Sequence, residues 1–259
     1  MGMPSYPTGR NLLDGKTVLV TAAAGTGIGY AVARRAIEEG ATVMLSDWHE
    51  RRLAEAAARI ASETGAAPPA TCLCDVTDQA QVHALRDAAA DRLGSLDVLI
   101  NNAGLGGEAA VTEMTDEAWH RVLDTTLTSV FRMTRAFLPA MYARGTGAII
   151  NNASVLGWRA QKGQAHYAAA KAGVMAFTRC SALEAADHGV RINAVAPSIA
   201  MHPFLAKVTS DELLADLSAR EAFSRPAEVW EVANVMVFLA SDLASYMTGE
   251  VLSVSSQHA

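Results

Sequence analysis

The stretch Lys16-Thr17-Val18-Leu19-Val20-Thr21-Ala22-Ala23-Ala24-Gly25-Thr26-Gly27-Ile28-Gly29 decides the fold. It opens with an apolar run that predicts a buried strand, and a glycine-rich turn and a helix over 30–39 follow. Glycines let the backbone approach a ligand, and a helix N-terminus offers N–H groups and the positive end of its dipole. This order predicts a site for the pyrophosphate of a dinucleotide, made by Gly25, Thr26, Gly27, Ile28 and Gly29.

Asp47 ends the second predicted strand, over 42–47. At this place a carboxylate accepts hydrogen bonds from an adenosine ribose and repels a 2′-phosphate, which favours NAD over NADP. Arg51 and Arg52 weaken this preference, because either side chain can reach back toward the ribose. The alternative is that Asp47 caps a helix over 50–63, but the glycine turn upstream favours the ribose role.

Predicted strands and helices alternate along the whole chain. Further strands are predicted over 70–74, 97–100, 148–152, 190–196 and 251–254, and one long helix begins at Thr115 and runs through Phe137. Alternation of this kind is typical of an α/β fold with a doubly wound, parallel, seven-stranded sheet of the Rossmann type. We expect a single domain over 1–259, with a substrate-binding flap at about 198–224. Ligands in such sheets bind at the carboxyl ends of the strands.

Ser154, Tyr167 and Lys171 follow the predicted strand over 148–152. The four-residue spacing of Tyr167 and Lys171 places both on one face of an Ala-rich helix. A nearby ammonium group favours phenolate, so we expect Lys171 to lower the pKa of Tyr167 from its ordinary ~10. Such a phenol can exchange a proton with an alcohol or a carbonyl oxygen, and Ser154 can hydrogen-bond the same oxygen. An ordinary amphipathic helix is the alternative, and only the remaining motifs decide between them.

Composition excludes several other classes. The 259 residues carry a net charge of -6 and no basic stripe, which argues against a nucleic-acid binder. No apolar run reaches the ~18 residues that a membrane span needs. Three cysteines, Cys72, Cys74 and Cys180, form no disulfide framework and no metal-ligand cluster, so we expect no metal and a cytoplasmic location.

Taken together, these residues resemble the short-chain dehydrogenase/reductase family over essentially the whole chain. The resemblance rests on Gly27-Ile28-Gly29, Asp75-Val76, Asn101-Asn102-Ala103-Gly104, Ser154, Tyr167, Lys171 and Pro197. It implies a nicotinamide cofactor and an acid/base role for Tyr167. It also implies that Lys171 binds the nicotinamide ribose and that Ser154 orients the substrate oxygen. The further residues that it places at the cofactor are Asp75, Val76, Asn101, Asn102, Ala103, Gly104, Pro197 and Ile199.

Four departures from the family pattern stand out. Ala22 occupies the place of the first glycine, and the loop after it is one residue longer. Thr126 stands where the family has a catalytic asparagine, whose water relay a threonine hydroxyl can also support. Ser198 and His202 replace the usual glycine and threonine after Pro197, and Ser255-Ser256 replace the terminal glycines.

Within the family, the chain is similar to actinobacterial steroid-degradation members, which act on an indanone remnant carried as a coenzyme A thioester. The residues that we expect at such a substrate are Trp158, Met201, His202 and Phe204. The family also implies a homotetramer, or else a dimer.

Two rival functions remain open. One is a 3-oxoacyl-thioester reductase that uses NADPH, against which Asp47 speaks. The other is a catalytically silent cofactor-binding protein, which the Ala22 and Thr126 departures keep open and the intact Ser154, Tyr167 and Lys171 oppose.

Overall fold

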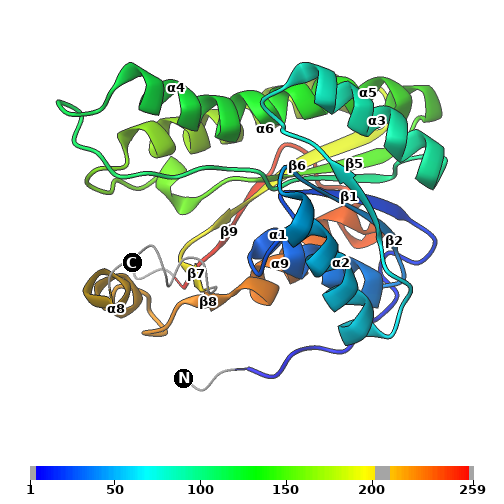
Figure 1. Ribbon diagram of the computed structural model, residues 1–259, viewed down its shortest axis with the longest axis horizontal. Coiled ribbons are helices and arrows are strands. Elements are labelled where there is room, and N and C mark those ends of the chain that lie inside the picture. The colour runs from blue at the N-terminus through cyan, green and yellow to red at the C-terminus, as the bar shows by residue number, and fades with distance from the viewer. Residues whose placement is uncertain (1–3, 202–210, 257–259) are drawn as a thin grey trace.

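A seven-stranded parallel sheet runs through the middle of the computed structural model, which describes residues 4–201 and 211–256 (Figure 1). Its strand order is β3-β2-β1-β4-β5-β6-β9, so the chain reverses its direction of travel between β1 and β4. This confirms the predicted doubly wound α/β fold. The strands are β1 Thr17–Thr21, β2 Thr42–Asp47, β3 Ala70–Leu73, β4 Val98–Asn101, β5 Gly147–Asn152, β6 Val190–Pro197 and β9 Val251–Val254.

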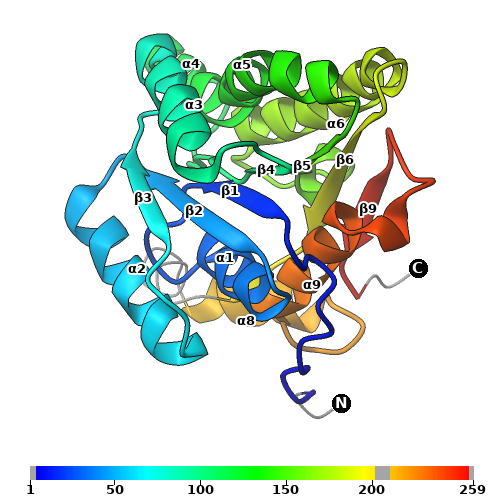
Figure 2. The ribbon, with the colours of Figure 1, turned by 90° about the vertical axis from the view of Figure 1, so that its right-hand side faces the viewer.

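Helices cover both faces of this sheet (Figure 2). One face carries α1 Ile28–Glu38, α2 Glu50–Thr64 and α9 Val229–Ala240. The other carries α3 Gln79–Leu93, α4 Asp116–Leu123, α5 Ser129–Arg144 and α6 Ala165–Ala186. A short parallel pair, β7 Ala200–Met201 and β8 Ala227–Glu228, and helix α8 Asp211–Ala219 lie beside the main sheet. Residues 202–210, which belong to the predicted flap, lie outside the described residues.

The two helical layers explain why β1 reads as an unbroken apolar run. Successive side chains of a strand point to opposite faces, and both faces are covered here. Val18 and Val20 pack with residues of α1 and α9, whereas Leu19 packs with residues of α3 and α5. The core therefore forms on both sides of the sheet and fixes the edge at which the strands end.

The long helix predicted from Thr115 through Phe137 is interrupted, which corrects that prediction. Thr115 does cap its start by accepting a hydrogen bond from the Ala118 N–H at 3.2 Å. A π turn over Asp124–Thr128 then separates α4 from α5. Such a turn inserts one extra residue into the helix and often marks a functional site. Here it carries Thr126, whose side chain is fully buried.

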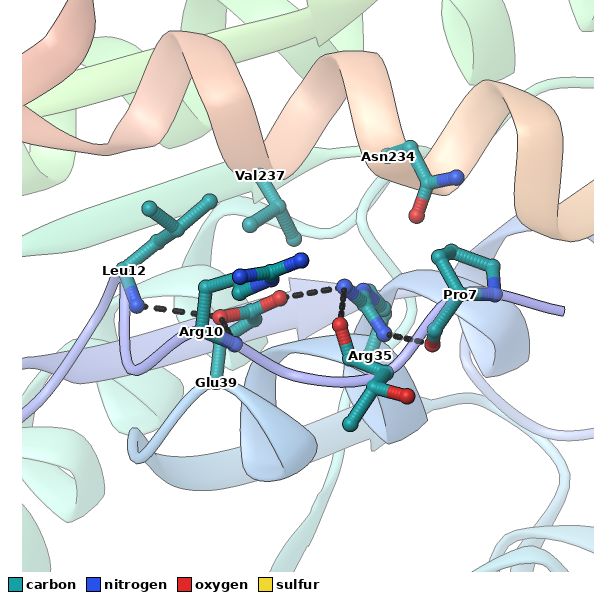
Figure 3. A pocket seen from close by; sticks show the side chains of 8 residues that line it. Pro7, Arg10, Leu12, Arg35, Glu39, Asn234 and Val237 are labelled. Carbon is teal, nitrogen blue, oxygen red and sulfur yellow. Dashed lines mark hydrogen bonds and ion pairs between the residues drawn. The ribbon is translucent and has the colours of Figure 1, made fainter.

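An N-terminal segment, residues 4–14, lies along α1 and α9 and is fastened by Glu39 (Figure 3). The Glu39 carboxylate is fully buried and pairs with Arg35, the residue one helical turn before it. It also accepts hydrogen bonds from the backbone N–H groups of Arg10, at 2.7 Å, and Leu12, at 3.0 Å. A buried charge is tolerated because its partners satisfy it.

A cavity of about 360 Å³ lies between this segment and the two helices. Asn234 and Val237 of α9 line it opposite Glu39 (Figure 3). Glu39 immediately follows α1 and shortly precedes β2, so this cavity lies at the amino ends of the strands. Ser154 follows β5, so it lies at the opposite ends of the strands from this cavity.

We expect Glu39→Ala to lower the free energy of unfolding by about 3–5 kcal/mol in urea denaturation, because Arg35 would lose its buried ion pair and the N–H groups of Arg10 and Leu12 would lose their acceptor. Glu55→Ala is the matched control, since Glu55 forms the same i,i+4 pair with Arg51 on α2 but both side chains are exposed. Removing an exposed pair costs at most about 1 kcal/mol. Equal losses in the two variants would contradict the expectation.

Candidate active site

Ser154, Tyr167 and Lys171 come together at the carboxyl ends of the central strands. Ser154 follows β5 and is 8% exposed, and the other two lie in the first two turns of α6. The Ser154 side chain lies close enough to the Tyr167 phenol to lower its pKa through hydrogen bonding. The Lys171 Nζ lies 5.6 Å from the centre of the Tyr167 ring. The structure therefore brings together the hydroxyl, the phenol and the amine that the sequence singled out.

Lys171 is held in place by the backbone of β5. Its Nζ donates a hydrogen bond to the Asn152 carbonyl oxygen, and its side chain is 2% exposed. Burial disfavours the charged form of an amine. It lowers the pKa of Lys171 from 10.5 to about 7, so the amine is only partly charged at neutral pH.

The expected acidic phenol is not what the structure shows. Burial raises the pKa of Tyr167 above its ordinary value of 10.0, and the hydrogen bond with Ser154 opposes that rise. The prediction counted the charge of Lys171 and omitted the burial of both groups. At neutral pH the protein alone therefore holds Tyr167 as a neutral phenol, which is the form that donates a proton to a carbonyl oxygen.

The Thr126 hydroxyl is bonded to the backbone of the loop after β4. It donates to the Leu105 carbonyl oxygen at 3.1 Å and accepts from the Leu105 N–H at 3.0 Å. The one hydrogen of this hydroxyl is thus already engaged. A Cβ added to Gly104 would lie 3.4 Å from the Lys171 Nζ. Thr126 therefore fixes the loop after β4 where that loop passes Lys171.

The turn after β1 is held in an unusual conformation. Ala22 has a φ of 51°, in the left-handed region that costs a residue other than glycine about 1 kcal/mol or more. The Asn102 Nδ2 donates to the Ala22 carbonyl oxygen at 3.1 Å and supports it. A Cβ added to Gly29 would lie 2.5 Å from both of those atoms, so only glycine fits there.

This turn fits a dinucleotide pyrophosphate. Helix α1 begins after Gly27, and no side chain caps it, so its first N–H groups point toward the carboxyl edge without a side-chain acceptor. Asn152 Oδ1 is buried at the same edge and has no hydrogen-bond partner among the described residues. Both features suit a ligand that carries phosphate oxygens and ribose hydroxyls. The predicted residues along this turn are Gly25, Thr26, Gly27, Ile28 and Gly29.

Asp47 lies at the end of β2 and faces the same turn. One of its carboxylate oxygens accepts from the Ala24 N–H and the other from the His49 N–H, each at 3.0 Å. His49 is the residue that caps α2, by accepting from the Arg52 N–H, so the capping alternative for Asp47 is wrong. The carboxylate therefore tethers the turn, and each oxygen keeps a second lone pair.

The remaining predicted cofactor residues lie along the same edge. Val76 is 8% exposed, and the Asp75 carboxylate accepts from the Thr77 hydroxyl at 2.7 Å. Asn102, Ala103 and Gly104 follow β4, Pro197 ends β6, and Ile199 lies between β6 and β7.

Two of the four predicted substrate residues are described. Trp158 follows a short turn, Val155–Gly157, and is 52% exposed, so it is not a packing residue of the core. Met201 lies in β7. His202 and Phe204 lie outside the described residues.

Arg59 is a site residue that the sequence did not reveal. It reaches from α2 to donate a hydrogen bond to the Gly25 carbonyl oxygen, and its guanidinium lies 4.0 Å from the centre of the Tyr30 ring. No motif marks Arg59, because its partner is 34 residues away in the chain.

No helix in the described ranges is both long enough and apolar enough to cross a membrane.

Comparisons with known proteins agree with this geometry. Residues 22–256 match a family model described as enoyl-(acyl carrier protein) reductase. The chain is 63% identical to the (5R,7aS)-5-hydroxy-7a-methyl-1-oxo-2,3,5,6,7,7a-hexahydro-1H-indene-carboxyl-CoA reductase of Mycobacterium tuberculosis, over 98% of this chain and 97% of that one. It is 39% identical to the 3-oxoacyl-(acyl-carrier-protein) reductase FabG of Vibrio harveyi, over 94% and 97%. A short-chain dehydrogenase from Mycobacterium smegmatis superposes with a TM-score of 0.88 at 55% identity, over 100% and 99%.

The low pKa of Lys171 predicts a stability that depends on pH. Between pH 7 and about 10 the unfolded chain binds a proton at this lysine that the folded chain does not. The free energy of unfolding should therefore rise with pH by up to about 1.4 kcal/mol per unit, and Lys171→Met should remove this contribution. Urea denaturation of both proteins at pH 7, 8 and 9 measures the difference.

Lys16→Met is the matched control, because Lys16 is a partly exposed lysine paired with Asp242. It removes one lysine and leaves the buried amine in place, so the pH dependence that Lys171 contributes should remain. Parallel curves for the wild type and Lys171→Met would show that the buried amine does not titrate as stated.

Proposed function

This chain belongs to the short-chain dehydrogenase/reductase family of NAD(P)-dependent oxidoreductases, and we propose that it interconverts a secondary alcohol and a ketone at Tyr167. The observation that carries the proposal is the close approach of Ser154 to the Tyr167 phenol, with the Lys171 Nζ 5.6 Å from the centre of the phenol ring. These three groups lie at the edge where α1 presents its uncapped N-terminus.

In the mechanism, the side chains of this site bind and protonate one substrate oxygen. Ser154 donates a hydrogen bond to that oxygen, and Tyr167 gives it a proton in reduction or takes one in oxidation. Lys171, fixed by the Asn152 carbonyl oxygen, orients the phenol and restores its proton. When bound, the nicotinamide supplies or accepts the hydride at the carbon that bears this oxygen. Residues 25–29, Asp47 and Val76 would hold the dinucleotide.

For the substrate we propose a coenzyme A thioester of a hydroxy-methyl-indanone, a steroid-ring remnant. The identity of 63% to a reductase of that class supports this choice. The exposed indole of Trp158 offers an apolar surface for fused rings beside the site. Arg159, the next residue, offers a cation for the phosphates of the thioester. We also propose that the segment at about 198–224 forms the flap over the ring system.

A 3-oxoacyl-thioester reductase is the second candidate, and the 39% identity to FabG of Vibrio harveyi supports it. A silent cofactor-binding protein is disfavoured, because Ser154, Tyr167 and Lys171 are all present, with Ser154 close to the Tyr167 phenol and the Lys171 Nζ 5.6 Å from the centre of its ring. Turnover assays separate the three candidate functions. They compare the ring thioester with a 3-oxoacyl thioester, each with NADH and with NADPH.

We further propose a cytoplasmic homotetramer. The free thiols of Cys72, Cys74 and Cys180 suit a reducing compartment. Exposed apolar side chains on α5 and α6, Phe131 and Leu183, suit contacts between subunits.

Tyr167→Phe tests the role of the phenol. We expect kcat to fall by about 10²–10⁴-fold, since the proton donor is lost while the ring and its packing remain. Cofactor affinity, measured by the fluorescence of bound NADH, should change little. A variant that keeps normal turnover would refute the assignment.

Asp47→Asn tests the cofactor preference. The substitution keeps the shape of the side chain and removes the charge that repels a 2′-phosphate. We expect the ratio of kcat/KM with NADH to kcat/KM with NADPH to fall by about tenfold or more, as a change of ~1.4 kcal/mol produces. An unchanged ratio would place the discrimination elsewhere.

A further inference from the structure

We propose that His166 is a positioning residue that holds residues 105–109, here called the pocket wall, at a fixed distance from Tyr167 and so sets the pocket width for a ring substrate. The inference rests on the proposed function, since it concerns the substrate side of the same site. It assigns a role to a buried histidine that the mechanism does not use.

The pocket wall is attached to its surroundings at every second residue. Leu105 is bound through both its N–H and its carbonyl oxygen to the Thr126 hydroxyl. Gly107 packs against His166. The Ala109 N–H donates to the Gly163 carbonyl oxygen at 3.0 Å. A segment without regular structure thus contacts its surroundings at three positions.

Two neighbouring glycines show what His166 does. A Cβ added to Gly106 would have nothing within 4 Å, whereas one added to Gly107 would lie 3.1 Å from the His166 Nε2. Neither glycine has a positive φ, so the backbone of either position accepts alanine. Contact with His166 is therefore what separates the two positions.

Packing holds His166 where it is. Its side chain is 2% exposed, and its Nδ1 is buried without a hydrogen-bond partner among the described residues. His166 directly precedes Tyr167 on α6, so the two rings leave the helix about 100° apart. One rigid helix therefore carries the phenol and the ring against which the pocket wall rests.

A second close approach joins the pocket wall to the residues just before α6. Gly163 has a φ of 78°, and a Cβ there would lie 2.7 Å from the Glu108 Cγ. Gly163 lies just before the start of α6. The pocket wall therefore contacts the start of α6, the helix of Tyr167, at two places. One is Gly163, just before the first turn, and the other is His166, within it.

The test compares Gly107→Ala with Gly106→Ala as the matched control, using the bicyclic thioester on which the Mycobacterium tuberculosis relative acts. Gly107→Ala places a methyl group 3.1 Å from the His166 Nε2, so the pocket wall or the imidazole must shift by a few tenths of an ångström. We expect KM to rise by about 3–10-fold with a smaller change in kcat, because the displacement disturbs substrate placement. Gly106→Ala should stay within about twofold of the wild type.

Removing the imidazole should rescue the KM defect of Gly107→Ala. In the double variant Gly107→Ala/His166→Ala the added methyl has room, so its KM should be no higher than that of His166→Ala alone. A four-carbon 3-oxoacyl-CoA should be affected less than the ring substrate in each variant. Additive effects, or equal effects of Gly106→Ala and Gly107→Ala, would overturn the proposal.

Hydrogen exchange gives a readout that needs no activity. The amides of Leu105 and Ala109 should exchange faster in Gly107→Ala and in His166→Ala than in the wild type or in Gly106→Ala. Unchanged exchange in both variants would refute the role of His166 even if the enzyme turned over the ring thioester. If the wild type turned over neither thioester, the proposed function would fail while exchange still decided the role of His166.

Discussion

A chain of three hydrogen bonds joins the turn after β1 to the amine of Lys171, and the geometry of the site depends on it. Asn102 donates to the Ala22 carbonyl oxygen at 3.1 Å, and Asn152 donates to Asn102 at 2.9 Å. The Asn152 carbonyl oxygen then accepts from Lys171. Amides are suited to this, since each offers both donors and an acceptor. These bonds therefore fix the positions of the carboxyl ends of β1, β4 and β5 relative to one another and to α6.

A second set of buried amides lies one residue earlier on the same strands. Asn101 donates to Asn151 at 2.9 Å, and Asn151 donates to the Thr178 hydroxyl at 2.9 Å. Lys171 and Thr178 are two turns apart on α6, so the helix is fastened to β5 at two points. A buried polar group is costly unless it is paired, so these bonds exclude other registers of helix against sheet. Tyr167, one turn before Lys171, is oriented as a result.

Much of the fold and of the candidate site was predictable from the sequence, because a parallel sheet allows few arrangements of the segments that follow its strands. Once Val18 to Val20 and Ile149 are buried strand residues, the motifs that follow their strands must meet at one edge. What the sequence could not predict depends on contacts between distant segments. The pKa of Tyr167 is set by burial, and the engagement of Thr126 is set by Leu105, a residue of another loop.

The same reason explains the other differences. The π turn within the predicted long helix, Arg59 on Gly25, and His166 against Gly107 leave no periodic signal in the sequence. In each case the side chain is ordinary and only its tertiary partner gives it a role. The motif residues, by contrast, act through local backbone geometry. Their pattern can therefore be recognised in a single sequence.

The left-handed backbone of Ala22 has a consequence for molecular recognition. Three hydrogen bonds hold this turn in a backbone conformation that alanine disfavours. They join Asn102 to Ala22, Asp47 to Ala24 and Arg59 to Gly25. A turn that is already ordered loses little conformational entropy when it associates with a dinucleotide. Selectivity between two such molecules must then arise where they differ chemically, and not from the energy of rearranging the turn around either one.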